Sequence, residues 1–254
     1  MLGDSTIRHQ FECLCSHGAG VISKQAGGIQ YKECTTLGLQ ILTPKKYSDW
    51  GSTLVEPRSH FVKSFAEQTM SEPDFLYFNG GLHYLQLIPH RKWGGGGALH
   101  KNAYLVWLNA EEVVSRFLNE SLEAFPALKI VFMASHSICE EKFTGAYQTA
   151  LQEIHHNATQ FASECVLFLE EKGFGCRHTN RCLDQCLQST FNNHGVSLLN
   201  RRAESVLPAS ARVLDAYELT KGACNHTKRG DGRHYDTKIL RKEMEALEAL
   251  LKQI

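Results

Sequence analysis

The sequence predicts an α/β protein: one three-layer α/β/α sandwich with a mostly parallel sheet, spanning residues 1–254. Short, nearly continuous apolar runs rich in branched and aromatic residues alternate with long stretches of helical periodicity, and strands buried on both faces have this composition. Strands that alternate with helices pair in parallel through right-handed crossovers, which place helices on both faces of the sheet. No internal repeat or linker rich in proline or serine divides the chain, so we expect a single domain.

Four apolar runs are predicted to be strands: 37–42, 74–79, 128–133 and 211–217. Helical periodicity occupies five further stretches: roughly 5–18, 60–70, 99–121, 144–171 and 196–207. The last helix is predicted from an apolar stripe whose members step by four, three, four and three residues: Leu240, Met244, Leu247, Leu251 and Ile254. In open sheets of this kind, active sites form at the carboxyl ends of the strands, so reactive side chains there are candidates for function.

The composition argues against several classes of protein. With 254 residues, 43% of them hydrophobic, the chain is long enough to bury a core and is typical of a globular protein. The 27 Lys and Arg residues balance 27 Asp and Glu residues, which argues against a protein that binds nucleic acid by neutralising phosphates. No apolar run reaches the length that crosses a bilayer, and the N-terminal residues lack the pattern of a signal peptide.

Three of the nine cysteines, Cys176, Cys182 and Cys186, cluster around His178 in a stretch that we expect to be a loop. Such a cluster is typical either of a disulfide-linked loop in a secretory protein or of a small zinc site. The spacing does not match the common pattern of zinc ligands, in which two cysteines are separated by two residues.

Three N-x-S/T sequons, at Asn119, Asn157 and Asn225, favour the secretory interpretation, because glycosylation and disulfide formation share a compartment. We therefore expect the cysteine cluster to form disulfides and the protein to be secreted or to reside in the Golgi lumen. A signal sequence or membrane anchor would then lie upstream of Met1.

Ser5 lies directly ahead of the first helical pattern, after Gly3 and Asp4. A serine at a strand-to-helix turn presents its hydroxyl at the edge of the sheet, and the helix N-terminus favours negative charge that develops nearby. The alternative is that Asp4 or Ser5 serves only as the helix N-cap.

Asp231 and His234 lie between the last predicted strand and the final helix. At this spacing the carboxylate can hold the Nδ1–H of the imidazole, which leaves Nε2 free to accept a proton from a nucleophile. The alternative is a surface turn with an incidental histidine, because the chain has 13 histidines.

Asn79 follows the run 74–78 and precedes Gly80 and Gly81. Its side-chain amide can donate to an oxyanion, and the two glycines permit close approach of the backbone to a substrate. The alternative is an ordinary turn, since Asn-Gly-Gly is typical of turns.

Taken in order, these three segments resemble the sequence blocks of the SGNH (GDSL-type) hydrolase superfamily. Gly3-Asp4-Ser5 matches its nucleophile block, Asn79 its oxyanion asparagine, and Asp231-Gly232-Arg233-His234 its final block. Gly-Asp-Ser-x-x-Arg and Asn-Gly-Gly-Leu-His are similar to the PC-esterase branch, which includes the trichome-birefringence-like polysaccharide O-acetyltransferases and the lumenal domain of the sialate O-acetyltransferases. The resemblance extends over nearly the whole chain and implies an SGNH-like, flavodoxin-like sandwich.

The resemblance implies a triad in which Ser5 is the nucleophile, His234 the base and Asp231 the residue that orients the base. The oxyanion hole would consist of Ser5, Asn79 and Gly51. Three further residues are expected near the substrate: Arg8, His83 and Tyr84.

The chain departs from the family pattern in three places. The usual Gly-x-Asn-Asp pattern is absent around Asn79, and Gly51 is only a weak match to the second block. The family also has a buried strand that leads into the nucleophile block, whereas two residues precede Gly3 here. We therefore expect that the first strand is missing from this chain.

The expected function is that of a serine-dependent esterase or O-acetyltransferase that acts on acetyl esters of glycans through an acyl-serine intermediate. Such an enzyme is expected to need no cofactor and no metal. Its partner would be an acetylated glycan or acyl donor, and we expect no nucleic acid partner. It would contact a membrane only through an upstream anchor. Two alternatives remain: a catalytically inactive SGNH-like domain that binds glycans or serves a larger membrane protein, and a zinc protein built on the cysteine cluster.

Overall fold

The computed structural model describes residues 1, 5–15, 21–26, 29–35, 39–41, 74–79, 110–145, 192–228 and 230–253, with the single positions 148, 152, 163, 166, 167 and 170. For residues 5, 24–26, 29–31, 39–41, 110 and 113 it describes the backbone alone. The helix expected over 60–70, most of the helix expected over 144–171 and the cysteine cluster around His178 lie outside these residues.

A parallel sheet lies at the centre of the described fold. Its strands are β4 (Phe75–Phe78), β5 (Lys129–Met133) and β6 (Arg212–Leu214), in the order β4-β5-β6. Both pairings are parallel, with Phe75 opposite Lys129 and Met133 opposite Leu214. The strands predicted over 74–79 and 128–133 are thereby confirmed.

The strand predicted over 211–217 is shorter than expected. β6 ends at Leu214, and a short helix, α11 (Ala216–Thr220), follows it. Asp215 ends the strand because its side chain caps this helix, accepting a hydrogen bond from the backbone N–H of Glu218 at 3.0 Å.

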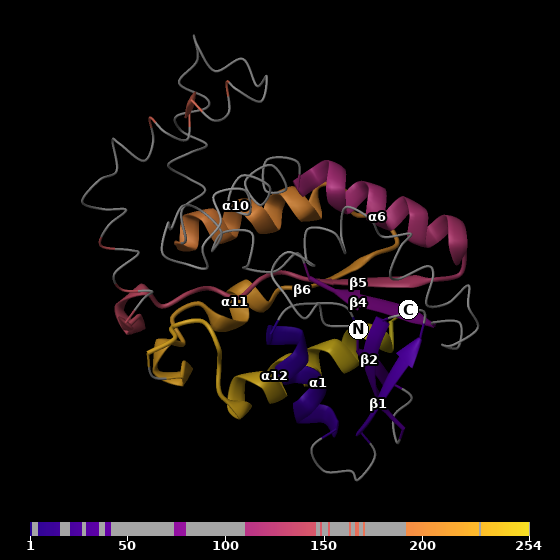
Figure 1. The fold of residues 1–254 in the computed structure, drawn as a ribbon, viewed down its shortest axis with the longest axis horizontal. Helices are drawn as coiled ribbons and strands as arrows, with labels where there is room; N and C mark the ends of the chain where they lie inside the picture. The colour runs from indigo at the N-terminus through magenta and orange to yellow at the C-terminus, as the bar shows by residue number, and fades with distance from the viewer. Residues whose placement is uncertain are drawn as a thin grey trace.

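Helices cover both faces of the parallel sheet. In Figure 1, α6 (Ala110–Ala124) and α10 (Asn193–Glu204) lie on one side, and α1 (Ser5–Cys15) and α12 (Thr237–Leu251) lie on the other. Successive side chains of β4 pack against opposite helical layers. The ring of Phe78 contacts that of Phe117 on α6, whereas Tyr77 belongs to the core cluster that includes Phe11 of α1 and Leu247 of α12. This burial on both faces is typical of an α/β protein.

The helix boundaries follow from local caps. Asn192 caps α10 by accepting from the backbone N–H of Gly195 at 2.8 Å, so this helix begins earlier than its periodicity predicted. Asp236 caps α12 by accepting from the backbone N–H groups of Lys238 and Ile239. The apolar stripe predicted for the last helix is confirmed in its centre, where three residues are buried: Leu240, Met244 and Leu247.

A second sheet that the sequence analysis missed is antiparallel. It contains β1 (Val21–Ala26), β2 (Ile29–Cys34) and β3 (Leu39–Ile41), in that order. The run 37–42 does contain a strand, but the expectation that it joins the parallel sheet is wrong, because β3 pairs antiparallel with β2. Ala26 lies opposite Ile29, so only two glycines connect β1 to β2, and Gly-Gly is typical of hairpin turns.

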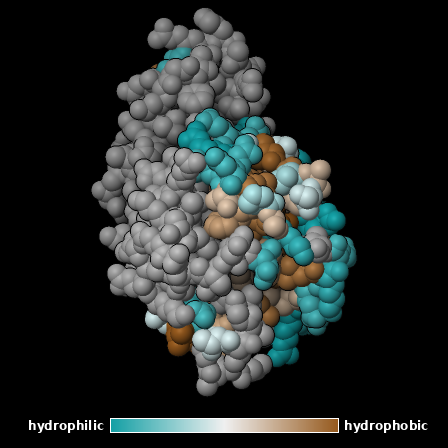
Figure 2. Space-filling view, turned by 90° about the vertical axis from the view of Figure 1, so that its right-hand side faces the viewer, coloured by the Kyte–Doolittle hydropathy of each residue, from teal (hydrophilic) through white to brown (hydrophobic). Residues whose placement is uncertain are grey.

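Two disulfides link distant parts of the described chain. Cys15 at the end of α1 pairs with Cys34 at the end of β2, and Cys139 pairs with Cys224. Disulfides persist in oxidising compartments, so these bonds are consistent with a secreted or lumenal environment. No helix in the described residues combines the length and apolarity needed to cross a membrane. In the coloured part of the face shown in Figure 2, hydrophobic residues lie among hydrophilic ones.

Candidate active site

The helix α1 begins at Ser5, the predicted nucleophile, of which the structure describes the backbone. Ile7 and Phe11 on this helix are completely buried in the core, which fixes its orientation against the sheet and α12. Arg8 lies on the exposed side of α1, where its Nε is 3.9 Å from Oε1 of Glu12. Arg8, which was predicted to contact the substrate, therefore forms an ion pair with a residue one turn along the same helix.

Asp231 and His234 lie together in a turn between the 3-10 helix η4 (Cys224–His226) and α12. Oδ1 of Asp231 accepts from the backbone N–H groups of Arg233, at 3.2 Å, and His234, at 3.1 Å. Oδ2 of Asp231 bonds to Nδ1 of His234. Because an ionised carboxylate can only accept, Nδ1 of His234 is the donor, and in the neutral ring Nε2 is then the unprotonated nitrogen, which can accept a proton. The side chains are partly accessible, at 25% for Asp231 and 12% for His234.

Several interactions act on the ionisation of Asp231. Burial alone would raise the pKa of its carboxyl group, but the hydrogen bond from His234 and the positive charges of His234 and Arg233 outweigh burial. The pKa of Asp231 therefore lies below its ordinary value, and the ionised form stabilises the folded state.

The substitution Asp231→Asn tests whether the ionised carboxylate of Asp231 stabilises the folded state. An acid whose pKa is lowered on folding contributes stability above its unfolded pKa, about 4 for aspartate, and that contribution disappears as the pH falls through the folded value. Asp231→Asn should therefore lower the free energy of unfolding at neutral pH, and the difference from wild type should close progressively below about pH 4. Urea unfolding at a series of pH values measures this. A difference that is the same at pH 7 and pH 3 would indicate lost packing instead of lost charge.

His9 is a site residue that the sequence analysis missed. Its ring lies edge to face with that of His234, with the ring centroids 5.1 Å apart. Burial lowers the pKa of His9, and the positive charges of Lys228 and His234 lower it further. His9 lies four residues after Ser5 on α1, so both residues share one face of the helix. That spacing is the one feature of the sequence from which this residue could have been found.

The dyad formed by Asp231 and His234 lies at the carboxyl edge of the parallel sheet. The chain leaves β5 at Met133 and runs through a buried segment to Cys139, whose backbone N–H donates to the carbonyl of Gly232 at 2.7 Å. Asn79 is at the same edge, immediately after β4, and is 1% exposed. Three other predicted site residues lie outside the described part of the chain: Gly51, His83 and Tyr84.

A fully buried polar network joins α1, β4 and α12 beside this edge. Nε2 of Gln10 donates to Oε2 of Glu243 at 2.8 Å, and the hydroxyl of Tyr77 donates to Oε1 of Gln10 at 3.0 Å. The other carboxylate oxygen of Glu243 is 2.5 Å from Nε2 of His136, and these two side chains are 0% and 1% exposed. The network thus ties the helix that begins at Ser5 to the helix that follows the dyad.

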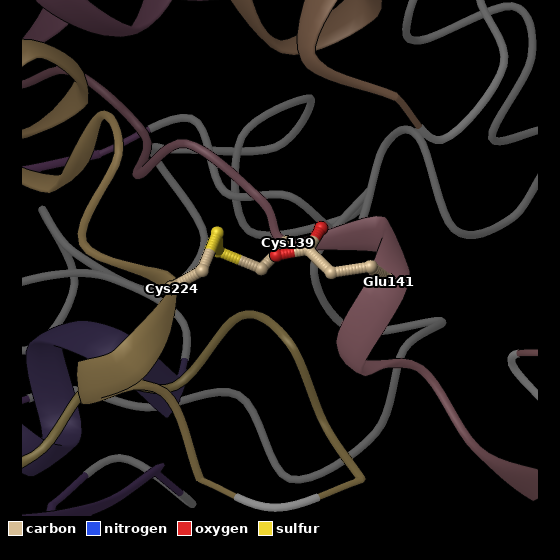
Figure 3. Close-up of side chains that lie close together, drawn as sticks. All are labelled: Cys139, Glu141 and Cys224. Carbon is tan, nitrogen blue, oxygen red and sulfur yellow. A yellow bond between two sulfur atoms is a disulfide. The ribbon is translucent and has the colours of Figure 1, made fainter.

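One group of side chains in the described residues has the composition of a metal site: Cys139, Glu141 and Cys224. Figure 3 shows that the two cysteines are joined to each other as a disulfide. A metal ion binds thiolates, so in this oxidised state the group offers only the carboxylate of Glu141. The group acts as a covalent link between the segment after β5 and the segment before the dyad.

The comparisons with known proteins are negative: no family model matches the chain, and no curated protein shows significant similarity to it.

Proposed function

We propose that this protein is a serine-dependent hydrolase or acyltransferase that acts on acetyl esters of glycans through an acetyl-Ser5 intermediate. The observation that carries the proposal is the arrangement of His234. Its Nδ1 is held by Asp231, and its ring contacts His9, one helical turn from Ser5. Acyl transfer needs a base of fixed tautomer within reach of the nucleophile, and the contact with His9 supports a position of His234 on the face of α1 that carries Ser5.

In the proposed reaction, Nε2 of His234 removes the proton of the Ser5 hydroxyl while Oγ of Ser5 attacks the carbonyl carbon of the ester. The alkoxide leaving group departs with the proton that His234 holds, and the acetyl group stays on Ser5. Asp231 stabilises the imidazolium that forms transiently. A neutral His9 adds no like charge beside this imidazolium, which is consistent with the lowered pKa of His9.

The negative charge that develops on the carbonyl oxygen needs hydrogen-bond donors. We assign this role to the backbone N–H of Ser5 at the beginning of α1, to the side-chain amide of Asn79 and to the backbone N–H of Gly51. Asn79 suits it because the amide lies at the carboxyl edge of the sheet in a buried position, where a hydrogen bond to an oxyanion is stronger than in water.

The acetyl-enzyme has two fates: water releases acetate, and a sugar hydroxyl receives the acetyl group. We favour a glycan substrate in a secreted or Golgi-lumenal setting because the described disulfides fit an oxidising compartment and Asn119 and Asn225, two of the sequon asparagines, are exposed. The proposal includes the SGNH-type three-layer sandwich, which the parallel sheet with helices on both faces supports.

The alternative is a catalytically inactive domain of the same fold that binds glycans or serves a larger membrane protein. The ion pair of Arg8 with Glu12 favours it modestly, because it occupies a side chain that was expected to contact substrate. The two candidates differ in one property, which is whether Ser5 is activated.

A fluorophosphonate probe tests the proposal, because it reacts with an activated serine and not with an ordinary surface hydroxyl. We expect stoichiometric labelling of the folded protein, with the adduct located on Ser5 by peptide mass spectrometry. Heat-unfolded protein and Ser5→Ala should remain unlabelled. Failure of the folded protein to react would favour the binding domain. Aryl acetate turnover with and without an added glycan acceptor then separates hydrolysis from transfer.

A further inference from the structure

Cys139 holds the loop that carries the dyad at two separate points. Its side chain forms the disulfide with Cys224, where η4 begins and from which the chain runs on to the dyad (Figure 3). Its backbone N–H donates to the carbonyl of Gly232 at 2.7 Å, in the centre of the turn between Asp231 and His234. One residue therefore fixes both the start of the loop and the turn itself.

Gly232 fits against this segment without space for a side chain. Its φ is +63°, and a Cβ atom built on it would lie 2.4 Å from the backbone oxygen of Cys139 and 2.6 Å from the ring of Phe143. Both approaches are closer than real Cβ atoms make, and one of them is to backbone, which cannot rotate away. Gly230 makes a second backbone contact, because its carbonyl accepts from the N–H of Thr144 at 3.3 Å.

The segment that ends at Cys139 is itself held firmly by α10. The side chain of Asn200 bonds to both the N–H and the carbonyl of Ser135, at 2.7 Å and 3.0 Å. The side chain of Asn193 bonds in the same two-pronged way to Ile138, at 2.8 Å and 2.7 Å. Cys139 therefore occupies a fixed position relative to the sheet and to α10.

Other contacts of the loop lie within it or reach this segment. The backbone N–H of Lys228 donates to the carbonyl of His234, in the same loop, at 2.9 Å, and the hydroxyl of Tyr235 donates to the carbonyl of Ser137, in the segment after β5, at 3.0 Å. These contacts flank the dyad, but none lies at the residues between Asp231 and His234. Gly232 is the residue through which the centre of the turn contacts Cys139.

We propose that Cys139 is a positioning residue for the dyad: through its disulfide to Cys224 and its backbone contact with Gly232, it sets where the imidazole of His234 lies relative to α1. The inference rests on the proposed function for its catalytic consequence. Cys139 does not contact the reacting atoms in this scheme. Its effect follows from geometry, because a displacement of about 1 Å in a catalytic group can cost about 100-fold in rate.

Two kinds of variant separate positioning from general stability. Gly232→Ala forces the turn away from Cys139, and Gly222→Ala is its matched control, since Gly222 has φ +76° but no atom within 4 Å of the added Cβ. The double variant Cys139→Ser/Cys224→Ser removes only the covalent link, and Cys15→Ser/Cys34→Ser removes the other disulfide as its control.

The first readout does not depend on activity: it is the low-field proton resonance of the His234 Nδ1–H, assigned by its loss in His234→Gln. We expect this resonance to be lost or shifted in Gly232→Ala and in Cys139→Ser/Cys224→Ser, and to be kept in both controls. The second readout is turnover of an aryl acetate, for which kcat should fall about 100-fold with KM nearly unchanged. If the double variant does not fold, mild reduction of the folded wild-type protein should move the same resonance.

The outcomes are distinct. Variants that melt at lower temperature but keep both the resonance and kcat would overturn the positioning role, as would a resonance already absent from the wild-type protein. A resonance that responds as expected in a protein without esterase activity would support the positioning role and contradict the proposed function. Normal activity in both wild type and Gly232→Ala would be consistent with the proposed function and would contradict the positioning role.

Discussion

Release of acetate from an aryl acetate is expected to fall by about four to six orders of magnitude in Ser5→Ala and in His234→Ala alike. Ser5 supplies the attacking oxygen, and His234 supplies the base whose Nδ1 is held by Asp231. Because the two act as a unit, the double variant should be scarcely slower than either single one.

Steady-state kinetics, with active-site titration by the fluorophosphonate probe, measure this loss. Circular dichroism and thermal unfolding should show that the fold is retained, since His234 is partly accessible and lies in a turn. The matched control is His226→Ala. His226 also pairs with a carboxylate, with Nδ1 2.8 Å from Oδ2 of Asp236, but has no part in the proposed reaction, so this variant should retain turnover. Substantial turnover in Ser5→Ala would show that the nucleophile is another residue.

The largest effect on stability is expected at Glu243. Its carboxylate is completely buried and bonds to both Gln10 and His136, so Glu243→Ala leaves two buried polar side chains without their acceptor and opens a cavity. Breaking a buried pair by removal of one partner typically costs about 3–5 kcal/mol, which is a large fraction of the stability of a domain. Chemical unfolding with urea measures the loss.

Glu245→Ala is the control for this variant, because Glu245 lies on the same helix but is exposed, and its removal should leave the unfolding midpoint unchanged. A double-mutant cycle then isolates the pair. The loss in free energy of unfolding for Glu243→Ala/His136→Ala should be smaller than the sum of the losses for the two single variants. The reason is that each side chain no longer stabilises the fold through the pair once its partner is removed. Strict additivity would mean that Glu243 acts through packing and not through His136.

Several features of the site were predictable because they depend on neighbours in the chain. The contact between Asp231 and His234 spans three residues and needs only a turn, and glycines precede and follow Asp231 to allow one. The strands at 74–79 and 128–133 were predictable for a similar reason, since a continuous apolar run indicates a strand that is buried on both faces of a sheet. The stripe of the last helix is also local, because helical period and hydrophobicity are visible in any one segment.

Other features depended on residues that are far apart in the sequence. Gln10 meets Glu243 across 233 positions and Cys139 meets Cys224 across 85, and no local pattern specifies either partner. Four cysteines already allow three pairings, so a connectivity cannot be obtained from their spacing. The run at 37–42 likewise has the composition of a strand, but composition does not state which strand it pairs with or in which direction.

The sequence by itself thus determined that this is an α/β protein with an acid–histidine turn ahead of its last helix. Only the tertiary structure decided which helix this turn faces. His9 reaches His234 because the buried side chains of Ile7 and Phe11 orient α1 against the core, and the turn stays in place because Cys139 and Gly232 meet without space for a side chain. Such close approaches arise when separate elements are brought together in the folded state, and they have no counterpart in the order of residues along the chain.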